Sequence, residues 1–123
     1  MKQLLLVFLG GGVGSVLRFL ISKTLNSSFQ PYFLGTFLVN ILGSLLIGFI
    51  IGLTLKGNYL TENQALLLAT GFCGGFTTFS TFALENQSLL KNGDLLHFTF
   101  YTLLSISIGI FAVIGGLWIS KSI

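Results

Sequence analysis

A run of glycine and hydroxyl residues, GGFTTFSTF at Gly74–Phe82, lies at the centre of an otherwise apolar segment. The uncharged stretch Ala65–Leu84 is 20 residues long, about the length that crosses ~30 Å of hydrocarbon, and its midpoint falls at Gly74–Gly75. Non-helical backbone at membrane depth is tolerated only where it is buried in protein or lines a cavity. Broken membrane helices place free carbonyls and half-helix ends where ions bind. The run therefore predicts a broken spanning helix that holds or conducts an ion.

The composition is that of a membrane protein. Only 7% of the 123 residues are charged, whereas a soluble domain carries about 25%. We expect an all-α fold and a single domain, residues 1–123, whose four transmembrane helices have the approximate bounds Leu4–Leu25, Tyr32–Leu55, Thr61–Leu90 and Leu95–Ser120. Because no small-residue cleavage site follows the first apolar stretch, that stretch is interpreted as a retained helix rather than a signal peptide.

The positive charges are almost evenly divided between the two sides of the membrane. With four spans, three lysines share one side and two share the other, with one arginine nearest the second side: Lys2, Lys56 and Lys121 against Lys23, Lys91 and Arg18. Orientation is set by an excess of Lys and Arg on one side. The pattern favours insertion in both orientations, although a weak bias that fixes one topology is the alternative. The dispersed cations form no patch for nucleic acid.

The second segment carries small and polar residues at every fourth position. Because this spacing keeps them on one helix face, they form a stripe of Thr36, Asn40, Ser44, Gly48 and Gly52. Helix packing alone explains the serine and the glycines. It does not explain Asn40, which lies ~12 Å into the membrane from Tyr32. An amide at that depth either pairs with protein groups or contacts a ligand.

The other segments carry further candidates. The glycines at Gly10–Gly14 predict close helix packing, and Arg18 beyond them either snorkels to the interface or attracts anions at a pore mouth. Phe79 and Phe82 in the third segment either pack or offer positively polarised ring edges to an anion. The carboxylate of Glu85 follows, where it either accepts a hydrogen bond or proton or reaches the interface. Segment four continues the hydroxyl line with Tyr101 and Ser105.

No pattern of catalytic residues is present, so we do not expect an enzyme. The single histidine, His97, has no partner at metal-ligand spacing, and the glycine cluster near the N-terminus follows no strand, as a nucleotide-binding motif requires. The single cysteine, Cys73, excludes an internal disulfide and is interpreted as a small packing residue.

These motifs resemble the Fluc (CrcB-type) family of fluoride channels. Three motifs match in order, GGGVGSVLR at Gly10–Arg18, GTFLVNILGSLLIG at Gly35–Gly48 and GFCGGFTTFSTF at Gly71–Phe82, and the last is highly specific. The resemblance implies an antiparallel dual-topology homodimer in the bacterial inner membrane. Such a dimer exports fluoride passively from the cytoplasm.

The resemblance also implies roles for individual residues. The backbone carbonyls of Gly74 and Thr77 would hold a structural Na⁺ at the dimer centre. The pore phenylalanines map to Phe79 and Phe82, and the pore asparagine to Asn40. The remaining positions are the vestibule arginine and the polar track, which correspond to Arg18, Thr36, Ser80, Thr81, Glu85, Tyr101 and Ser105.

Two other classes of protein fit the same size and hydropathy. A small multidrug or guanidinium exporter needs a carboxylate within its first helix, and the stretch Leu4–Ile21 has none. A structural subunit of a larger membrane complex would explain the packing glycines but would leave Asn40 and the TTFSTF run without a reason.

Overall fold

Four long helical segments run back and forth along one axis in the computed structural model, which describes residues 1–28 and 33–123. Each is long and apolar enough to cross a membrane. The segments are α1 (Lys2–Ser28), α2 (Leu34–Leu55), a third span made of α3 (Glu62–Ala65), η1 (Leu66–Cys73), α4 (Gly74–Phe76) and α5 (Phe79–Lys91), and α6 (Leu95–Ser122). These bounds match the four expected spans; the expected start of the second at Tyr32 lies outside the described residues.

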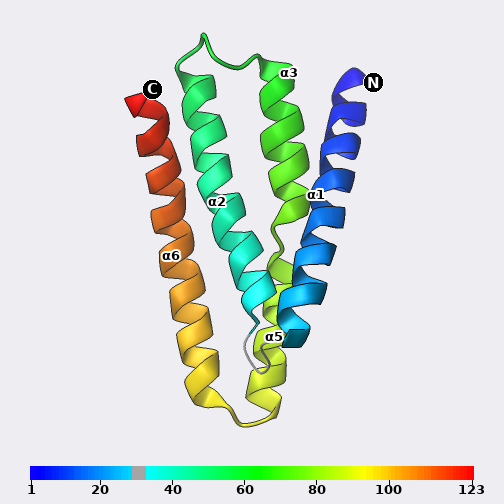
Figure 1. The fold of residues 1–123 in the computed structure, drawn as a ribbon, viewed down its shortest axis with the longest axis vertical. Coiled ribbons are helices and arrows are strands. Elements are labelled where there is room, and N and C mark those ends of the chain that lie inside the picture. The colour runs from blue at the N-terminus through cyan, green and yellow to red at the C-terminus, as the bar shows by residue number, and fades with distance from the viewer. Residues whose placement is uncertain (29–32) are drawn as a thin grey trace.

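The two chain ends lie at the same end of the bundle (Figure 1). There the Lys56 ammonium, just past α2, donates a hydrogen bond of 2.9 Å to the Ser120 carbonyl near the end of α6. The cation offsets the partial negative charge of that helix terminus. Lys56 and the C-terminus therefore share one side, as a chain of four spans predicts.

Glycines bring α1 and the third span into backbone contact. A side chain at Gly75 would collide with the Gly11 carbonyl, and one at Gly14 would lie 2.8 Å from the Phe76 amide. Gly10 meets the same span one turn earlier, where an added Cβ would lie 2.8 Å from the Phe72 amide. The predicted packing role of the N-terminal glycines is confirmed.

A second glycine contact joins α2 to α6. A side chain at Gly48 would collide with the Val113 carbonyl, and one at Gly116 would lie 2.6 Å from the Phe49 amide. Gly52 packs on Ser120, where an added Cβ would lie 2.7 Å from the serine Cβ. The small-residue end of the α2 stripe thus packs against the corresponding stripe of α6.

The third span is broken, but two residues later than the glycine pair suggests. Gly74 is helical, with φ −61° and ψ −37°, whereas Thr77 and Thr78 are extended, with ψ of 159° and 121°. The preceding turns form a π-helix, η1, a feature that the sequence pattern does not show. Gly75 serves close packing on α1 instead of breaking the helix.

The outer faces of the spans expose large apolar side chains, among them Phe8, Phe19, Leu103, Phe111 and Trp118. Exposed apolar surface of this extent is expected where lipid surrounds the helices. Cys73, in contrast, is 1% exposed and packs with Ile50 and Ala69, which confirms its packing role.

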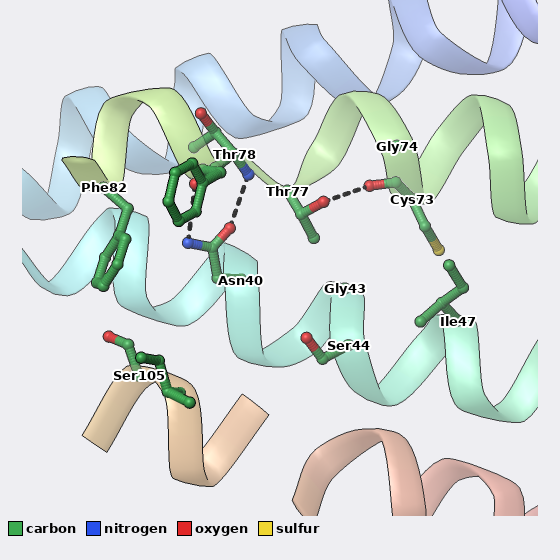
Figure 2. A pocket seen from close by; sticks show the side chains of 12 residues that line it. Asn40, Gly43, Ser44, Ile47, Cys73, Gly74, Thr77, Thr78, Phe82 and Ser105 are labelled. Carbon is green, nitrogen blue, oxygen red and sulfur yellow. Dashed lines mark hydrogen bonds between the residues drawn. The ribbon is translucent and has the colours of Figure 1, made fainter. Parts of the chain in front are cut away.

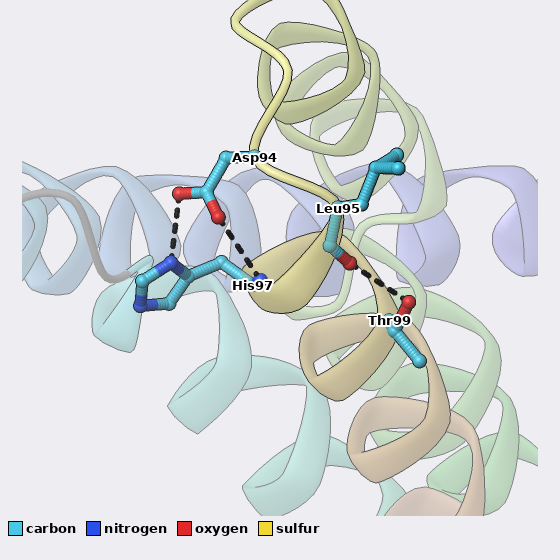
Figure 3. Close-up of polar contacts among 4 residues, drawn as sticks. All are labelled: Asp94, Leu95, His97 and Thr99. Atoms are coloured by element: carbon cyan, nitrogen blue, oxygen red, sulfur yellow. Dashed lines mark hydrogen bonds and ion pairs between the residues drawn. The ribbon is translucent and has the colours of Figure 1, made fainter.

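The turn before α6 is held by an acidic helix cap (Figure 3). Asp94 Oδ1 accepts a hydrogen bond from the His97 amide at 3.2 Å, and Oδ2 lies 2.7 Å from His97 Nδ1. Gly93 precedes the cap with φ +73°, a conformation that favours glycine. His97 is therefore part of a helix cap, and the described residues contain no group of three or more potential metal-ligating side chains.

Replacing Gly116 by alanine should destabilise the protein, because the new methyl group collides with the α2 backbone. We expect a loss of about 1–3 kcal/mol, partly offset by the ~1 kcal/mol advantage of alanine in a helix. Gly115→Ala is the matched control, since its Cβ would lie 3.8 Å from Leu45 Cδ1, an ordinary contact. Thermal unfolding in detergent should give a lower midpoint for Gly116→Ala alone, and equal midpoints for the two variants would contradict this packing.

Candidate functional site

The break at Thr77 and Thr78 leaves backbone groups of a membrane span outside any helix. In such a setting every N–H and C=O needs another partner, because hydrocarbon offers none. The Thr77 amide returns to the Cys73 carbonyl at 3.0 Å, and the Thr77 hydroxyl donates to the same carbonyl at 2.8 Å. Thr77, the residue that follows α4, therefore caps the C-terminal end of this helix.

The side chain of Asn40 satisfies both backbone groups of Thr78 (Figure 2). Its Oδ1 accepts from the Thr78 amide at 2.7 Å, and its Nδ2 donates to the Thr78 carbonyl at 3.1 Å. The amide of Asn40 thus pairs with the extended residue as a neighbouring strand would. This pairing explains the partly buried asparagine as a structural partner, and it leaves one of its two N–H donors for a ligand.

Two further contacts stabilise the half-helices around the break. Arg18 Nε donates to the Gly75 carbonyl at 2.9 Å, which ties α1 to the end of α4. Thr78 caps α5, since its hydroxyl accepts from the Thr81 amide at 3.2 Å. Arg18 is therefore more than a snorkelling anchor; its role at a pore mouth stays a prediction.

One carbonyl at the break lacks its usual helical partner. In an unbroken helix the Thr78 amide would donate to the Gly74 carbonyl four residues earlier. Here that amide donates to Asn40 instead. Gly74 itself is exposed, and a Cβ built there meets no atom within 4 Å. The Gly74 carbonyl is therefore available to a ligand or to another chain.

An open cavity of about 320 Å³ lies directly beside the break (Figure 2). Six of the predicted site residues line it, from α2, the third span and α6: Asn40, Gly74, Thr77, Phe79, Phe82 and Ser105. Phe79 is 79% exposed, so its ring protrudes from the single chain. The Ser105 hydroxyl is buried and has no hydrogen-bond partner among the described residues. It offers a free donor to this cavity.

A second polar cluster surrounds the carboxylate of Glu85. The Thr36 hydroxyl donates to Oε2 and the Tyr101 hydroxyl to Oε1, both at 2.7 Å, and Asn26 Nδ2 donates to Oε2 at 3.3 Å. We call these four residues, Asn26, Thr36, Glu85 and Tyr101, the carboxylate hub. None of them lines the cavity beside the break. The hub draws one side chain from each of the four spans.

Aromatic rings connect the cavity to the carboxylate hub. Phe82 lies 5.9 Å from Phe79 and 5.1 Å from Tyr101, measured between ring centroids, and the second contact is edge to face. The two remaining polar candidates, Ser80 and Thr81, lie in the first turn of α5. Ser80 is exposed, and its Oγ lies 3.4 Å from the Thr78 hydroxyl. Thr81 is partly buried. The predicted residues therefore form two connected groups rather than one.

Two residues of this site, Thr78 and Asn26, are not predicted from the sequence. Thr78 carries a local signal, because a threonine three residues before Thr81 at the start of an apolar run is typical of a helix N-cap. Asn26 carries none, since its partners Thr36 and Glu85 lie 10 and 59 residues away in the chain.

Comparison with known proteins identifies the family. Residues 5–117 match the family described as CrcB-like protein, Camphor Resistance (CrcB). Similar relatives include proteins named "Fluoride-specific ion channel FluC" from Gloeothece citriformis, 48% identical over 98% of both chains, and from Bacteroides fragilis, 48% identical over 94% of both. Another of the same name, from Azobacteroides pseudotrichonymphae, is 46% identical over 94% of both chains. The chain, a bundle of four spans with a broken third span, therefore belongs to the CrcB-like family.

Proposed function

We propose that the chain forms a fluoride-selective channel that lets fluoride leave the bacterial cytoplasm passively through the inner membrane. The observation that carries this proposal is the near full-length identity, 46–48%, to relatives named fluoride-specific ion channels. Those names describe an ion channel and not an enzyme, in agreement with the sequence analysis. The cavity at the break supports the assignment, because it offers an anion hydrogen-bond donors inside the span.

Fluoride is small and strongly hydrated, so a narrow path must replace its water with positively polarised groups. In the cavity these are the unpartnered Ser105 hydroxyl, the second N–H of Asn40 and the ring edges of Phe79 and Phe82. The hydroxyls of Thr36 and Tyr101 donate to Glu85 in this conformation. We place the dehydration step at the cavity. The path continues past Phe82 to the carboxylate hub, where the polar-track residues Thr36, Glu85 and Tyr101 lie.

The working unit in this proposal is an antiparallel homodimer with both orientations in one membrane, surrounded by lipid. The nearly equal division of lysines between the two ends supports dual insertion. The exposed ring of Phe79 and the openness of the cavity support a second chain, which would complete the walls. A two-fold axis in the membrane plane through the break would place two cavities symmetrically.

A structural Na⁺ at the dimer centre belongs to the same proposal. The fit rests on the break: the Gly74 carbonyl has lost its helical amide partner, and Thr77 is extended, so its carbonyl leaves the helix direction. Hard cations prefer oxygen ligands. A pair of such carbonyls from each of two chains would supply four, and the bound ion would offset their partial negative charge.

Fluoride efflux from liposomes that contain the purified protein tests the function, with chloride efflux as the control. Passive fluoride flux without chloride flux is expected. Phe79→Ile and Phe82→Ile keep bulk but delete the polarised ring edge, so each should lower flux about tenfold or more, which corresponds to ~1.4 kcal/mol of lost ion stabilisation. Phe8→Ile on the outer face of α1 is the matched control. Normal flux in a variant with both substitutions would show that these rings only pack.

A C-terminal reporter should be found on both sides of the membrane if the chain inserts in both orientations. Two lysines inserted after Asn58, in the loop between α2 and α3, or after Asn92, in the loop between α5 and α6, should lock opposite topologies, because these loops lie at opposite ends of the bundle (Figure 1). Each locked form alone should be inactive, and coexpression of the two should restore fluoride resistance in cells. Full activity of one locked form alone would contradict the antiparallel dimer.

Replacing sodium by N-methylglucamine throughout purification and reconstitution should lower activity or the dimer fraction. Thr77→Ser should behave like the wild type in sodium, since it keeps both the carbonyl and the hydroxyl that donates to Cys73. Size-exclusion chromatography and flux assays are run together. An unchanged dimer with unchanged flux in the absence of sodium would rule out a structural role for the ion.

A further inference from the structure

The junction between α1 and α2 is built around the side chain of Asn26. Its Oδ1 accepts the Gly35 amide at 2.7 Å, in the first turn of α2, where Phe33 at the N-cap position makes no side-chain cap. A backbone N–H can only donate, so this contact fixes which end of the asparagine is oxygen. The Nδ2 group therefore points to the opposite side, toward the carboxylate hub.

The same amide group holds the hub. Nδ2 lies 3.3 Å from both Thr36 Oγ1 and Glu85 Oε2, so Asn26 reaches α2 and α5 at once. Glu85 is 7% exposed and Thr36 is fully buried. A buried carboxylate needs such donors, because each unmade hydrogen bond to a charged group costs more than one between neutral groups.

The absence of a side chain at Gly35 leaves room for Asn26 to reach this position. A Cβ built at Gly35 would lie 2.9 Å from Asn26 Oδ1 and 2.6 Å from Ser22 Cα on α1. Any side chain at position 35 would therefore push the two helices apart and draw the asparagine away from Glu85. The contact between α1 and α2 therefore requires both Gly35 and Asn26.

We propose that Asn26 is a positioning residue for conduction, which holds the Glu85 carboxylate in place within the hub so that its charge is met by protein donors and not turned toward fluoride. This inference rests on the proposed channel function. Glu85 does not line the cavity, and the ring of Phe82 lies between the cavity and Tyr101 of the hub. A carboxylate released from these donors would present its full charge to a passing anion and repel it. Asn26 prevents this by holding one carboxylate oxygen from the α1 side.

Asn26→Asp separates this role from simple helix capping. Aspartate keeps the oxygen that accepts the Gly35 amide, but it replaces the donor to Glu85 by a second carboxylate oxygen. If Asn26 acts only as a cap, flux should stay within about twofold of the wild type, since aspartate caps helices as well as asparagine. If Asn26 positions Glu85, fluoride efflux from liposomes should fall at least about tenfold.

An exchange of the two groups tests whether the loss acts through Glu85. In Asn26→Asp with Glu85→Gln, the new amide at position 85 can donate to the new carboxylate at position 26, and the net charge equals that of the wild type. The pair should conduct at least about tenfold better than Asn26→Asp alone. Asn92→Asp, at an exposed site after α5, is the control for added charge at this end.

Three results would overturn the proposal: near-normal flux in Asn26→Asp, a double variant no better than Asn26→Asp, or equal loss in Asn92→Asp. Should Asn26→Asp not fold, the same comparison is made on thermal midpoints in detergent, where the double variant must recover the stability that Asn26→Asp loses, and no recovery overturns the link. Absence of fluoride flux in the wild type would instead refute the channel function, while the thermal comparison would still decide whether Asn26 acts on Glu85.

Discussion

The pair of hydrogen bonds between the Asn40 side chain and the Thr78 backbone is the interaction on which the rest of this structure depends. A membrane span cannot open its backbone to hydrocarbon, so a break requires a partner that both donates and accepts. An asparagine side chain has both groups in one plane. Because Asn40 takes the Thr78 amide, the Gly74 carbonyl is released from the helix, and α5 begins anew with Thr78 as its cap.

The break is also fixed from the opposite side by α1. Gly10 and Gly14 admit the third span to backbone distance, and this proximity lets Arg18 reach the Gly75 carbonyl at 2.9 Å. A larger residue at these glycines would move the arginine away from the end of α4. The packing glycines and the polar contacts are therefore parts of one arrangement, in which close helix approach makes short hydrogen bonds to the broken backbone possible.

The sequence predicts the four spans and the presence of a break, since charge-free length and glycine-hydroxyl content are local properties of the chain. It does not predict the position of the break, because Gly74 and Gly75 are ordinary helix breakers by propensity and only tertiary contact with Gly11 reveals the packing role of Gly75. Thr36, Glu85 and Tyr101 can each be identified as a candidate from the sequence. Their hydrogen bonds to one another join residues that are distant in the chain, so the sequence does not predict them. Asn26 has no local signal at all.

The most direct measurement of the central claim is hydrogen exchange at the Thr78 amide, followed by NMR in detergent micelles or bilayers. If Asn40 holds the break, this extended residue should be protected like the neighbouring helical amides, and Asn40→Leu should abolish its protection while amides in α1 keep theirs. Exchange of the wild-type Thr78 amide as fast as that of the turn residues Gly57 and Gly93, or protection unchanged by Asn40→Leu, would contradict the account.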